Sequence, residues 1–304
     1  MCLNPSANPK MGAIRGLPVN AFSIRLACAA GRYFSAHQEE KLNTLFQRIP
    51  TGIETLGSRI IAAIESVGEA VIILVMSLLW AVRPPLRLRQ FILALHFVGV
   101  GSLFIVGLTG LFSGGVMALQ IGQAFRMFNA ETLTGPTVAL ALSRELSPVF
   151  TCLMITARAG SAMATELGTM RVTEQLDALR TMAVNPIDYL VAPRILACLL
   201  MAPALTMFFN LIGMFGCWLV AVQFLGIDHG IFMARIREFV HPSDIFNGMV
   251  KATVFGVVLA TVGCHQGLTA QGGARGVGMA TTRAVVIASV LILVFDYFLT
   301  VIMF

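Results

Sequence analysis

Residues 91–125 read FILALHFVGVGSLFIVGLTGLFSGGVMALQIGQAF, and this stretch decides the fold class. Its 35 residues include no Asp, Glu, Lys or Arg. About 20 apolar residues are enough for a helix to cross the hydrocarbon of a bilayer. The stretch therefore predicts one transmembrane helix, tilted or with a re-entrant tip near Gly110–Gly115, and two passes are the alternative. The Gly-x-x-x-Gly spacing at 110–114 predicts a close contact with another helix.

The composition of the whole chain points to the same class. Of 304 residues, 57% are hydrophobic and 12% are charged, against about 25% charged residues in soluble domains. This excludes a soluble enzyme, a disordered chain and a nucleic-acid-binding module, so no nucleic-acid partner is expected. The six cysteines form no Cys-x-x-Cys pair and have no His at ligand spacing. We expect them to be small apolar side chains and not a metal site.

Four further apolar regions give five predicted spans in an all-α polytopic membrane protein. The predicted spans are residues 91–125, 136–157, 193–225, 245–268 and 283–304. If the N-terminus lies inside the cell, sixteen Lys and Arg fall in inside segments and three in outside segments. Because short basic segments stay on the cytoplasmic side, we expect a cytoplasmic N-terminus and a C-terminus outside.

The chain before the first span divides into two parts. Residues 1–50 are basic and have no long apolar run, so we interpret them as a poorly ordered cytoplasmic extension. An organelle transit peptide and a misassigned start codon are the alternatives. Residues 53–82 carry apolar side chains at three- and four-residue steps, which predicts an amphipathic helix in the membrane interface. A full span is the alternative, but Glu65 and Glu69 oppose it because carboxylates are costly in lipid.

The segment between the second and third predicted spans begins with small residues and continues as a helical pattern. Leu167, Met170, Leu176 and Leu179 recur at helical spacing, with charged residues between them. An amphipathic helix at the cytoplasmic surface is suited to docking in a groove of a soluble partner. A plain surface loop and a helix lying on lipid are the alternatives.

Eight ordered motifs resemble the MlaE/YrbE family of ABC-transporter permeases, and the resemblance covers about residues 53–304. They are RELSP at 144–148, ARAGSA at 157–162, ELGTM at 166–170, TEQL at 173–176, AVNP at 183–186, APR at 192–194, ATTRAVV at 280–286 and DYFLT at 296–300. The resemblance implies a permease domain over residues 51–304 and leaves residues 1–50 outside it.

The resemblance also implies a function. It implies a homodimer that moves phospholipid between the inner and outer membranes, and an interfacial elbow helix before five spans. It implies a cytoplasmic ABC ATPase and an MCE-domain lipid-binding protein as partners, in a bacterial inner membrane with a periplasmic C-terminus. A plastid inner envelope is the alternative location. A cytoplasmic coupling helix between the second and third spans is assigned Arg158, Glu166, Gly168, Met170, Arg171, Glu174, Gln175 and Asp177.

The ATPase is expected to be a separate chain. A phosphate-binding G-x-x-x-x-G-K-[ST] loop is missing from the sequence. The Gly-rich residues 272–278 have no Lys-Ser or Lys-Thr after them, and we interpret them as a flexible inside loop. We therefore expect no enzymatic activity and no cofactor bound by this chain, with ATP and Mg²⁺ held by the partner ATPase.

Two charges inside apolar runs are the candidate site residues. A charge within a span must face a cavity or a partner, so we expect Glu145 and Lys251 to line a lipid cavity of the dimer. There they would contact a lipid headgroup or each other, since a lysine suits a phosphate as a point charge. Structural pairing of Glu145 with Arg144 or Arg158 is the alternative. For Asp296 we expect a structural hydrogen-bond network in the last span.

Two other functions remain open on the sequence. A secondary transporter driven by an ion gradient would use Glu145, Lys251 and Asp296 as relay groups and would work without an ATPase. A non-transporting membrane anchor for an MCE-type protein would not need the charges at all.

Overall fold

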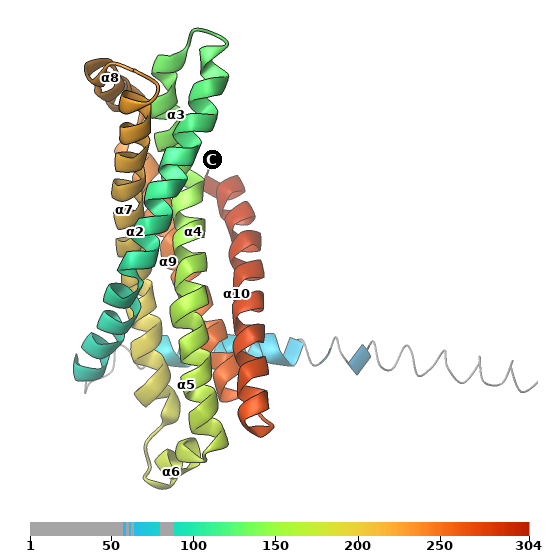
Figure 1. Cartoon of the computed structure of the whole chain (residues 1–304). Helices are drawn as coiled ribbons and strands as arrows, with labels where there is room; N and C mark the ends of the chain where they lie inside the picture. The colour runs from blue at the N-terminus through green and yellow to red at the C-terminus, as the bar shows by residue number, and fades with distance from the viewer. Residues whose placement is uncertain (1–56, 59–60, 62–63, 80–87, 304) are drawn as a thin grey trace, which may run out of the picture. The chain divides into compact units, whose positions relative to one another are not determined.

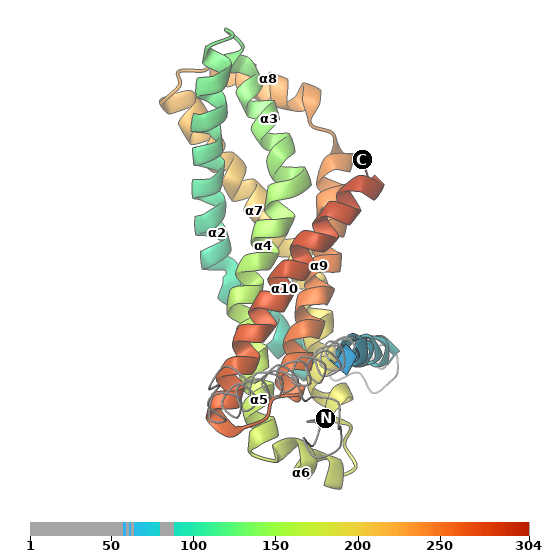
Figure 2. The same ribbon diagram turned by 90° about the vertical axis from the view of Figure 1, so that its right-hand side faces the viewer.

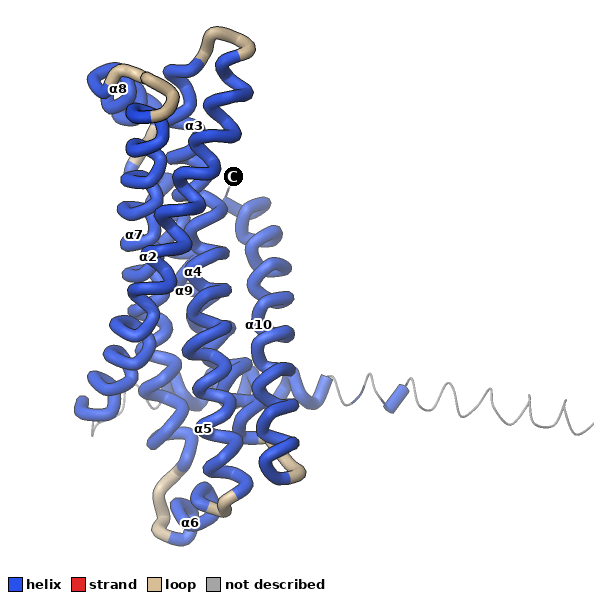
Figure 3. Tube along the Cα trace, in the orientation of Figure 1, coloured by secondary structure: helices blue, strands red, loops and turns tan. Residues whose placement is uncertain are grey.

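The computed structural model describes residues 57–58, 61, 64–79 and 88–303. Residues 1–50 and parts of the predicted interfacial helix lie outside these ranges. Residues Ser66–Phe304 form one compact unit, which contains the long helices of the described residues. Every regular element in the described residues is helical (Figure 3), so the all-α prediction is confirmed.

Five helical segments among the described residues are long and apolar enough to cross a membrane, which confirms the predicted number of spans. In chain order they are α2 (Leu88–Arg126), the run Glu131–Val172, the run Ile187–Gln223, α9 (Pro242–Leu268) and α10 (Gly273–Met303). Helix α2 continues unbroken for 39 residues through the glycines at 110–115. Two passes and a re-entrant tip are therefore both excluded for this stretch.

The second and third segments are helical runs that contain π-helical turns, two within the second run and one at the start of the third. The second run consists of η1 (Glu131–Leu133), α3 (Thr134–Ala141), η2 (Leu142–Leu146), α4 (Ser147–Ile155), η3 (Thr156–Gly160) and α5 (Ser161–Val172). The third consists of η4 (Ile187–Val191) and α7 (Ala192–Gln223). The elements η2, η3 and η4 are π-helical, a geometry that often marks functional positions within helices.

Two inside segments that were predicted to lie between spans are largely helical in the structure. Residues 158–172 continue the second run, and the predicted helix from Leu167 to Leu179 is divided between α5 and the short α6 (Gln175–Thr181). The division occurs at Glu174, whose φ of 60° cannot belong to a right-handed helix. The Gly-rich stretch is likewise not a flexible loop, because α10 begins at Gly273.

The long helices lie side by side, and their connections gather at two ends (Figures 1 and 2). We call these the α6 end and the α8 end, after α6 and α8 (His229–Phe239). Helices α2, α7 and α10 start toward the α6 end, whereas α9 starts toward the α8 end. Helix α7 packs against α2 and α9, and α10 packs against α9 and α5.

Glycines let α2 and α7 approach closely. A Cβ added to Gly114 would lie 1.9 Å from the carbonyl oxygen of Gly213, and one added to Gly110 would lie 3.1 Å from that of Phe209. Such contacts let two backbones pack directly, which is how helices associate where lipid gives no hydrophobic driving force. The close helix contact predicted from the Gly-x-x-x-Gly spacing is confirmed.

A helix over residues 66–79, drawn in cyan in Figure 1, runs across the long helices. Ile73 and Leu74 pack against the core of the bundle. At the α6 end of α9, the Glu69 carboxylate lies 3.2 Å from Nε2 of His265. The helix over residues 66–79 runs across the long helices and not along them, which favours the predicted interfacial helix over a full span.

Candidate functional site

A group of charged side chains lies between the second run, α9 and α10. Lys251 Nζ lies 2.9 Å from Oε2 of Glu145 and 3.3 Å from Oδ1 of Asp296. It also donates hydrogen bonds to the Thr300 hydroxyl at 2.8 Å and to the Arg144 carbonyl oxygen at 3.1 Å. We call Lys251, Glu145, Asp296 and Thr300 the Lys251 cluster.

The members of the Lys251 cluster differ in burial. The Lys251 side chain is 0% exposed, whereas Glu145 is 38% and Asp296 is 20% exposed. The ammonium is therefore enclosed by oxygen atoms, and the two carboxylates reach the surface of the single chain. With one cation and two carboxylates, the cluster presents hydrogen-bond acceptors and a formal net charge of −1 to that surface.

The π-helical turn η2 and a glycine on α9 position the cluster. A Cβ added to Gly248 would lie 2.1 Å from the carbonyl oxygen of Ser143, so only a glycine allows α9 to approach η2 this closely. Lys251 lies nine residues after Pro242, which is about 14 Å from the start of α9 at 1.5 Å per residue. The cluster therefore lies within the bundle and nearer to its α8 end.

Neighbouring residues of η2 bind α9 at two points. Arg144 places Nη2 at 2.8 Å and Nε at 3.0 Å from Oδ1 of Asp244. The other oxygen of Asp244 accepts a hydrogen bond from the backbone N–H of His241 at 3.0 Å and so caps α9. Asp244 and Lys251 are two helical turns apart on one face of α9. Together the two contacts fix the register of η2 against α9.

The structure thus brings the two sequence-predicted residues Glu145 and Lys251 into contact. Arg144 and Arg158 were considered as alternative partners of Glu145, and they contact Asp244 and the first span, respectively. Arg158 Nη1 donates to the Phe97 carbonyl oxygen at 2.8 Å. Both arginines thereby link the second run to a neighbouring helix.

The residues assigned to one coupling helix occupy different places. Arg158 lies in η3 and not on a surface helix. Glu166, Gly168, Met170 and Arg171 lie on α5, Glu174 precedes α6, and Gln175 and Asp177 lie on α6. These residues do not form a single helix, because α5 ends at Val172 and the positive φ of Glu174 separates it from α6.

Several of these side chains hold α5 in place. Glu166 pairs with Arg194 at the start of α7 at 2.8 Å. A Cβ added to Gly168 would lie 3.3 Å from Ala270 and Val277, which flank the start of α10. On α6, Leu176 is buried, whereas Gln175 and Asp177 are exposed at the tip of the α6 end. Asp177 binds Arg171 at 3.3 Å and Arg180 at 3.1 Å.

Sequence reasoning did not single out three of the residues at these contacts. Thr300 and Asp244 complete the surroundings of Lys251 and Arg144, and Arg194 pairs with Glu166. A signal for the first two existed in the spacing, because Asp296 and Thr300 are four residues apart and Asp244 and Lys251 seven apart. Within the described residues, no group of three or more His, Cys, Asp or Glu is placed to hold a metal ion.

The sequence of the chain is similar to those of known permeases. A family model described as Permease MlaE matches residues 91–302. A probable ABC transporter permease protein of Rickettsia prowazekii is 41% identical over 223 residues, which is 73% of this chain and 86% of that protein.

Two further relatives have more specific names. The intermembrane phospholipid transport system permease protein MlaE of Haemophilus influenzae is 42% identical over 221 residues, 72% of this chain and 83% of that protein. The chloroplastic protein TRIGALACTOSYLDIACYLGLYCEROL 1 of Arabidopsis thaliana is 40% identical over 212 residues, 70% of this chain and 61% of that protein.

Proposed function

The chain belongs to the MlaE permease family, and from this premise we propose that it is the membrane subunit of an ABC transporter that moves phospholipid between membranes. The name of the Haemophilus relative supports the cargo. The observation that carries the proposal is the Lys251 cluster, because a buried lysine between two carboxylates within spans marks a polar path through the membrane.

A second copy of the chain would complete that path. Glu145 and Asp296 reach the surface of the single chain in a part of the bundle that lies within the membrane. Carboxylates facing hydrocarbon are costly, so this surface requires a polar cavity. A homodimer that pairs these surfaces would enclose such a cavity, with apolar side chains of α10 such as Val294 and Phe298 bordering it for the acyl chains.

In this cavity the cluster would contact the headgroup mainly through its acceptors. Lys251 is enclosed, so Glu145 and Asp296 are the groups that a headgroup ammonium or hydroxyl meets first. A phosphate would gain access to Lys251 only if a carboxylate moved aside, since both occupy its donors. Such an exchange of partners would link lipid binding to a change in helix packing.

The α6 end would be cytoplasmic. Basic residues are concentrated in the sequence segments at this end, as expected from the positive-inside rule. We place the protein in a bacterial inner membrane with its C-terminus in the periplasm, and a plastid inner envelope is the alternative suggested by the Arabidopsis relative. The helix over residues 66–79 would lie in the cytoplasmic interface as an elbow helix.

The tip of the α6 end would contact the ATPase, which would hold ATP and Mg²⁺. Gln175 and Asp177 of α6 and the exposed Met182 after it form the available surface there. Helix α5, held by the Glu166–Arg194 pair and by close packing at Gly168, would transmit the motion of the ATPase into the bundle. An MCE-domain protein would bind at the opposite, α8 end.

Replacing Met182 by glutamate is expected to reduce ATPase association at least tenfold. The side chain is 65% exposed, so the fold should survive, whereas a carboxylate placed in an apolar contact loses its hydration without gaining a partner. The measurement is the amount of ATPase that co-purifies with the tagged permease.

Met127 offers a matched control, because it is 77% exposed at the α8 end. Met127→Glu should leave ATPase association unchanged. If Met127→Glu and not Met182→Glu released the ATPase, the proposed orientation would be reversed.

The proposed function is tested by affinity purification of the tagged chain from native membranes in a gentle detergent. Mass spectrometry of the sample should identify an ATPase with a phosphate-binding loop, an MCE-domain protein and bound phospholipid. Recovery of the chain without an ATPase would favour the secondary transporter driven by an ion gradient. Recovery with an MCE-domain protein alone would favour a membrane anchor.

A further inference from the structure

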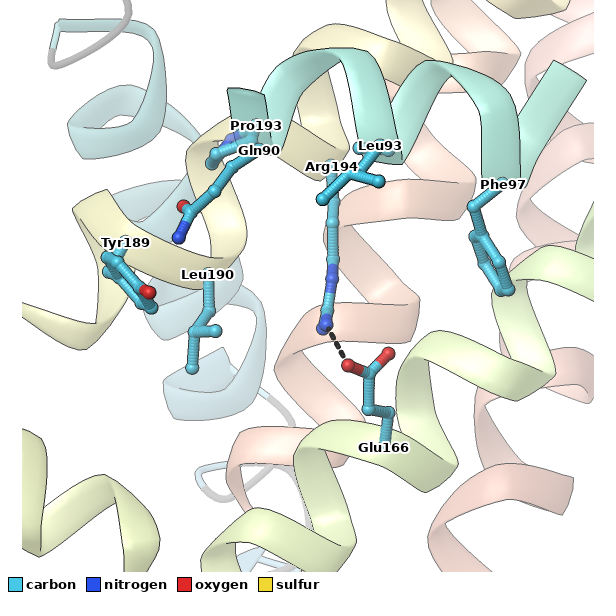
Figure 4. Close-up of a pocket in the computed structure, with 9 residues that line it drawn as sticks. Gln90, Leu93, Phe97, Glu166, Tyr189, Leu190, Pro193 and Arg194 are labelled. Carbon is cyan, nitrogen blue, oxygen red and sulfur yellow. Dashed lines mark ion pairs between the residues drawn. The ribbon is translucent and has the colours of Figure 1, made fainter. Parts of the chain in front are cut away.

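A pocket with polar side chains in its lining lies at the α6 end of the bundle, apart from the Lys251 cluster (Figure 4). It has a volume of about 290 Å³ and is lined by the start of α2, by α5 and by the start of the third run. Figure 4 shows Arg194 of α7 extending to Glu166 of α5, whereas Gln90, at the beginning of α2, extends toward Tyr189 and Leu190. Tyr189 adds a further polar side chain to the lining.

Two polar atoms of the pocket are buried without a hydrogen-bond partner. Arg194 uses Nη2 to bind Glu166 at 2.8 Å, but its Nη1 has no acceptor within the structure described. The side-chain oxygen of Gln90 has no donor there either. The Arg194 side chain is only 12% exposed. Because buried polar groups are nearly always hydrogen-bonded, one charged donor and one acceptor beside the pocket need partners that the described residues do not supply.

The remaining lining is apolar and leads to the outer surface of α2. Leu93, Ala94 and Phe97 line the α2 side, and Leu190 and Pro193 line the other. Leu93 and its neighbour Ile92 are largely exposed on α2, which in a membrane places them against lipid. A ligand that fits this lining has a polar group bound at Arg194 and Gln90 and an apolar part that leaves along α2.

The unpartnered Nη1 of Arg194 favours an anion for the polar group. The Glu166 carboxylate, which is 55% exposed and also lines the pocket, balances the charge of the guanidinium. A guanidinium matches the oxygen atoms of a phosphate through parallel N–H groups. Gln90 lies in the first turn of α2, where the free backbone N–H groups of the helix add positive potential. The oxygen of Gln90 accepts a hydrogen bond, so the group next to the phosphate carries a donor, such as a hydroxyl or an ammonium.

We propose that this pocket binds a phospholipid of the leaflet at the α6 end, separate from any lipid bound at the Lys251 cluster. Arg194 Nη1 donates to a phosphate oxygen, Gln90 accepts from a headgroup hydroxyl or ammonium, and the chains follow Leu93 and Phe97. The bound lipid would join α2, α5 and α7 where the Glu166–Arg194 pair already links two of them. The inference requires a membrane but not transport, so it does not depend on the proposed function.

Retention of defined lipids by the delipidated full chain tests the proposal. The probes are phosphatidylglycerol and phosphatidylethanolamine, whose headgroups carry donors, and phosphatidylcholine, whose headgroup does not. Native mass spectrometry should show the first two retained about tenfold more than the third, as expected for one hydrogen bond to a charged or polar partner. Inorganic phosphate at millimolar concentration should not displace them.

Three variants assign the lipid to this pocket. Gln90→Leu leaves the Glu166–Arg194 pair intact and should remove the preference over phosphatidylcholine. Arg194→Gln should lower retention of all three lipids about tenfold. Arg283→Gln is the matched control, because Arg283 is an exposed arginine on α10 outside the pocket, and it should retain lipid as the wild type does.

Three outcomes would overturn the proposal. These are equal retention of the three lipids by the wild type, displacement by inorganic phosphate alone, and an unchanged preference in Gln90→Leu. The lipid preference of Gln90→Leu still tests the proposal if Arg194→Gln fails to fold. Loss of transport with normal lipid retention, in contrast, would count against the proposed function and not against this pocket.

Discussion

Replacing Lys251 by methionine is expected to lower the free energy of unfolding by about 3–5 kcal/mol, the usual effect of removing one partner of a buried ion pair. Lys251 is the cation that contacts both Glu145 and Asp296. Without it, two carboxylates lie side by side within the membrane and repel each other. The measurements are the yield of monodisperse protein after detergent extraction and the midpoint of thermal unfolding.

A neutral variant separates the loss of charge balance from the loss of packing. In the triple variant Lys251→Met, Glu145→Gln and Asp296→Asn, side-chain size is nearly conserved and no charge remains. Because replacing a complete buried ion pair is often neutral for stability, the triple variant should recover most of the stability lost in Lys251→Met. A triple variant less stable than Lys251→Met would show that the charges are not the cause of the destabilisation.

Gly114→Ala is expected to lower the free energy of unfolding by at least about 2 kcal/mol, within the usual range for overpacking. The new methyl group would lie 1.9 Å from the carbonyl oxygen of Gly213. This obstacle is backbone and cannot rotate away, so α2 and α7 would have to separate along their contact. Thermal unfolding in detergent measures the effect.

The adjacent glycine provides the control on the same helix. A Cβ on Gly115 would meet the side chain of Val220 at 3.4 Å, an ordinary contact. Gly115→Ala should therefore be neutral or stabilise by about 0.5–1 kcal/mol, because alanine is the better helix former. Equal destabilisation by both changes would contradict the close packing of Gly114 against Gly213.

Much of the fold follows from hydropathy. The five spans required only long apolar runs, and the single passage of α2 followed from its unbroken pattern. The boundaries were less accurate where charges are satisfied inside the bundle. The second predicted span ended at residue 157, before Arg158 and Glu166, yet these two side chains bind the Phe97 carbonyl oxygen and Arg194. Hydropathy reflects the charge of a residue, but it gives no information on which distant residue pairs with that charge in the fold.

The candidate site, too, has parts that the sequence predicts and parts that depend on how the helices pack. Glu145 and Lys251 were recognised because each is a charge within an apolar run, and the structure places them in contact. The participation of Asp296 and Thr300 depends on the register of α10 against α9. The unsatisfied Arg194 Nη1 depends on the distance between three helices. Spacing within one segment indicates that Asp296 and Thr300 share a face of α10, but it does not show which helix that face contacts.

The central claim is that phospholipid passes the Lys251 cluster during ATP-driven transport. It is tested most directly by placing the permease and its ATPase in vesicles and measuring transfer of a labelled phospholipid to acceptor vesicles with and without ATP. The wild type should transfer lipid only with ATP, and the neutral triple variant should be at least tenfold slower at equal amounts of assembled complex. Transfer by the triple variant at the wild-type rate would contradict the claim.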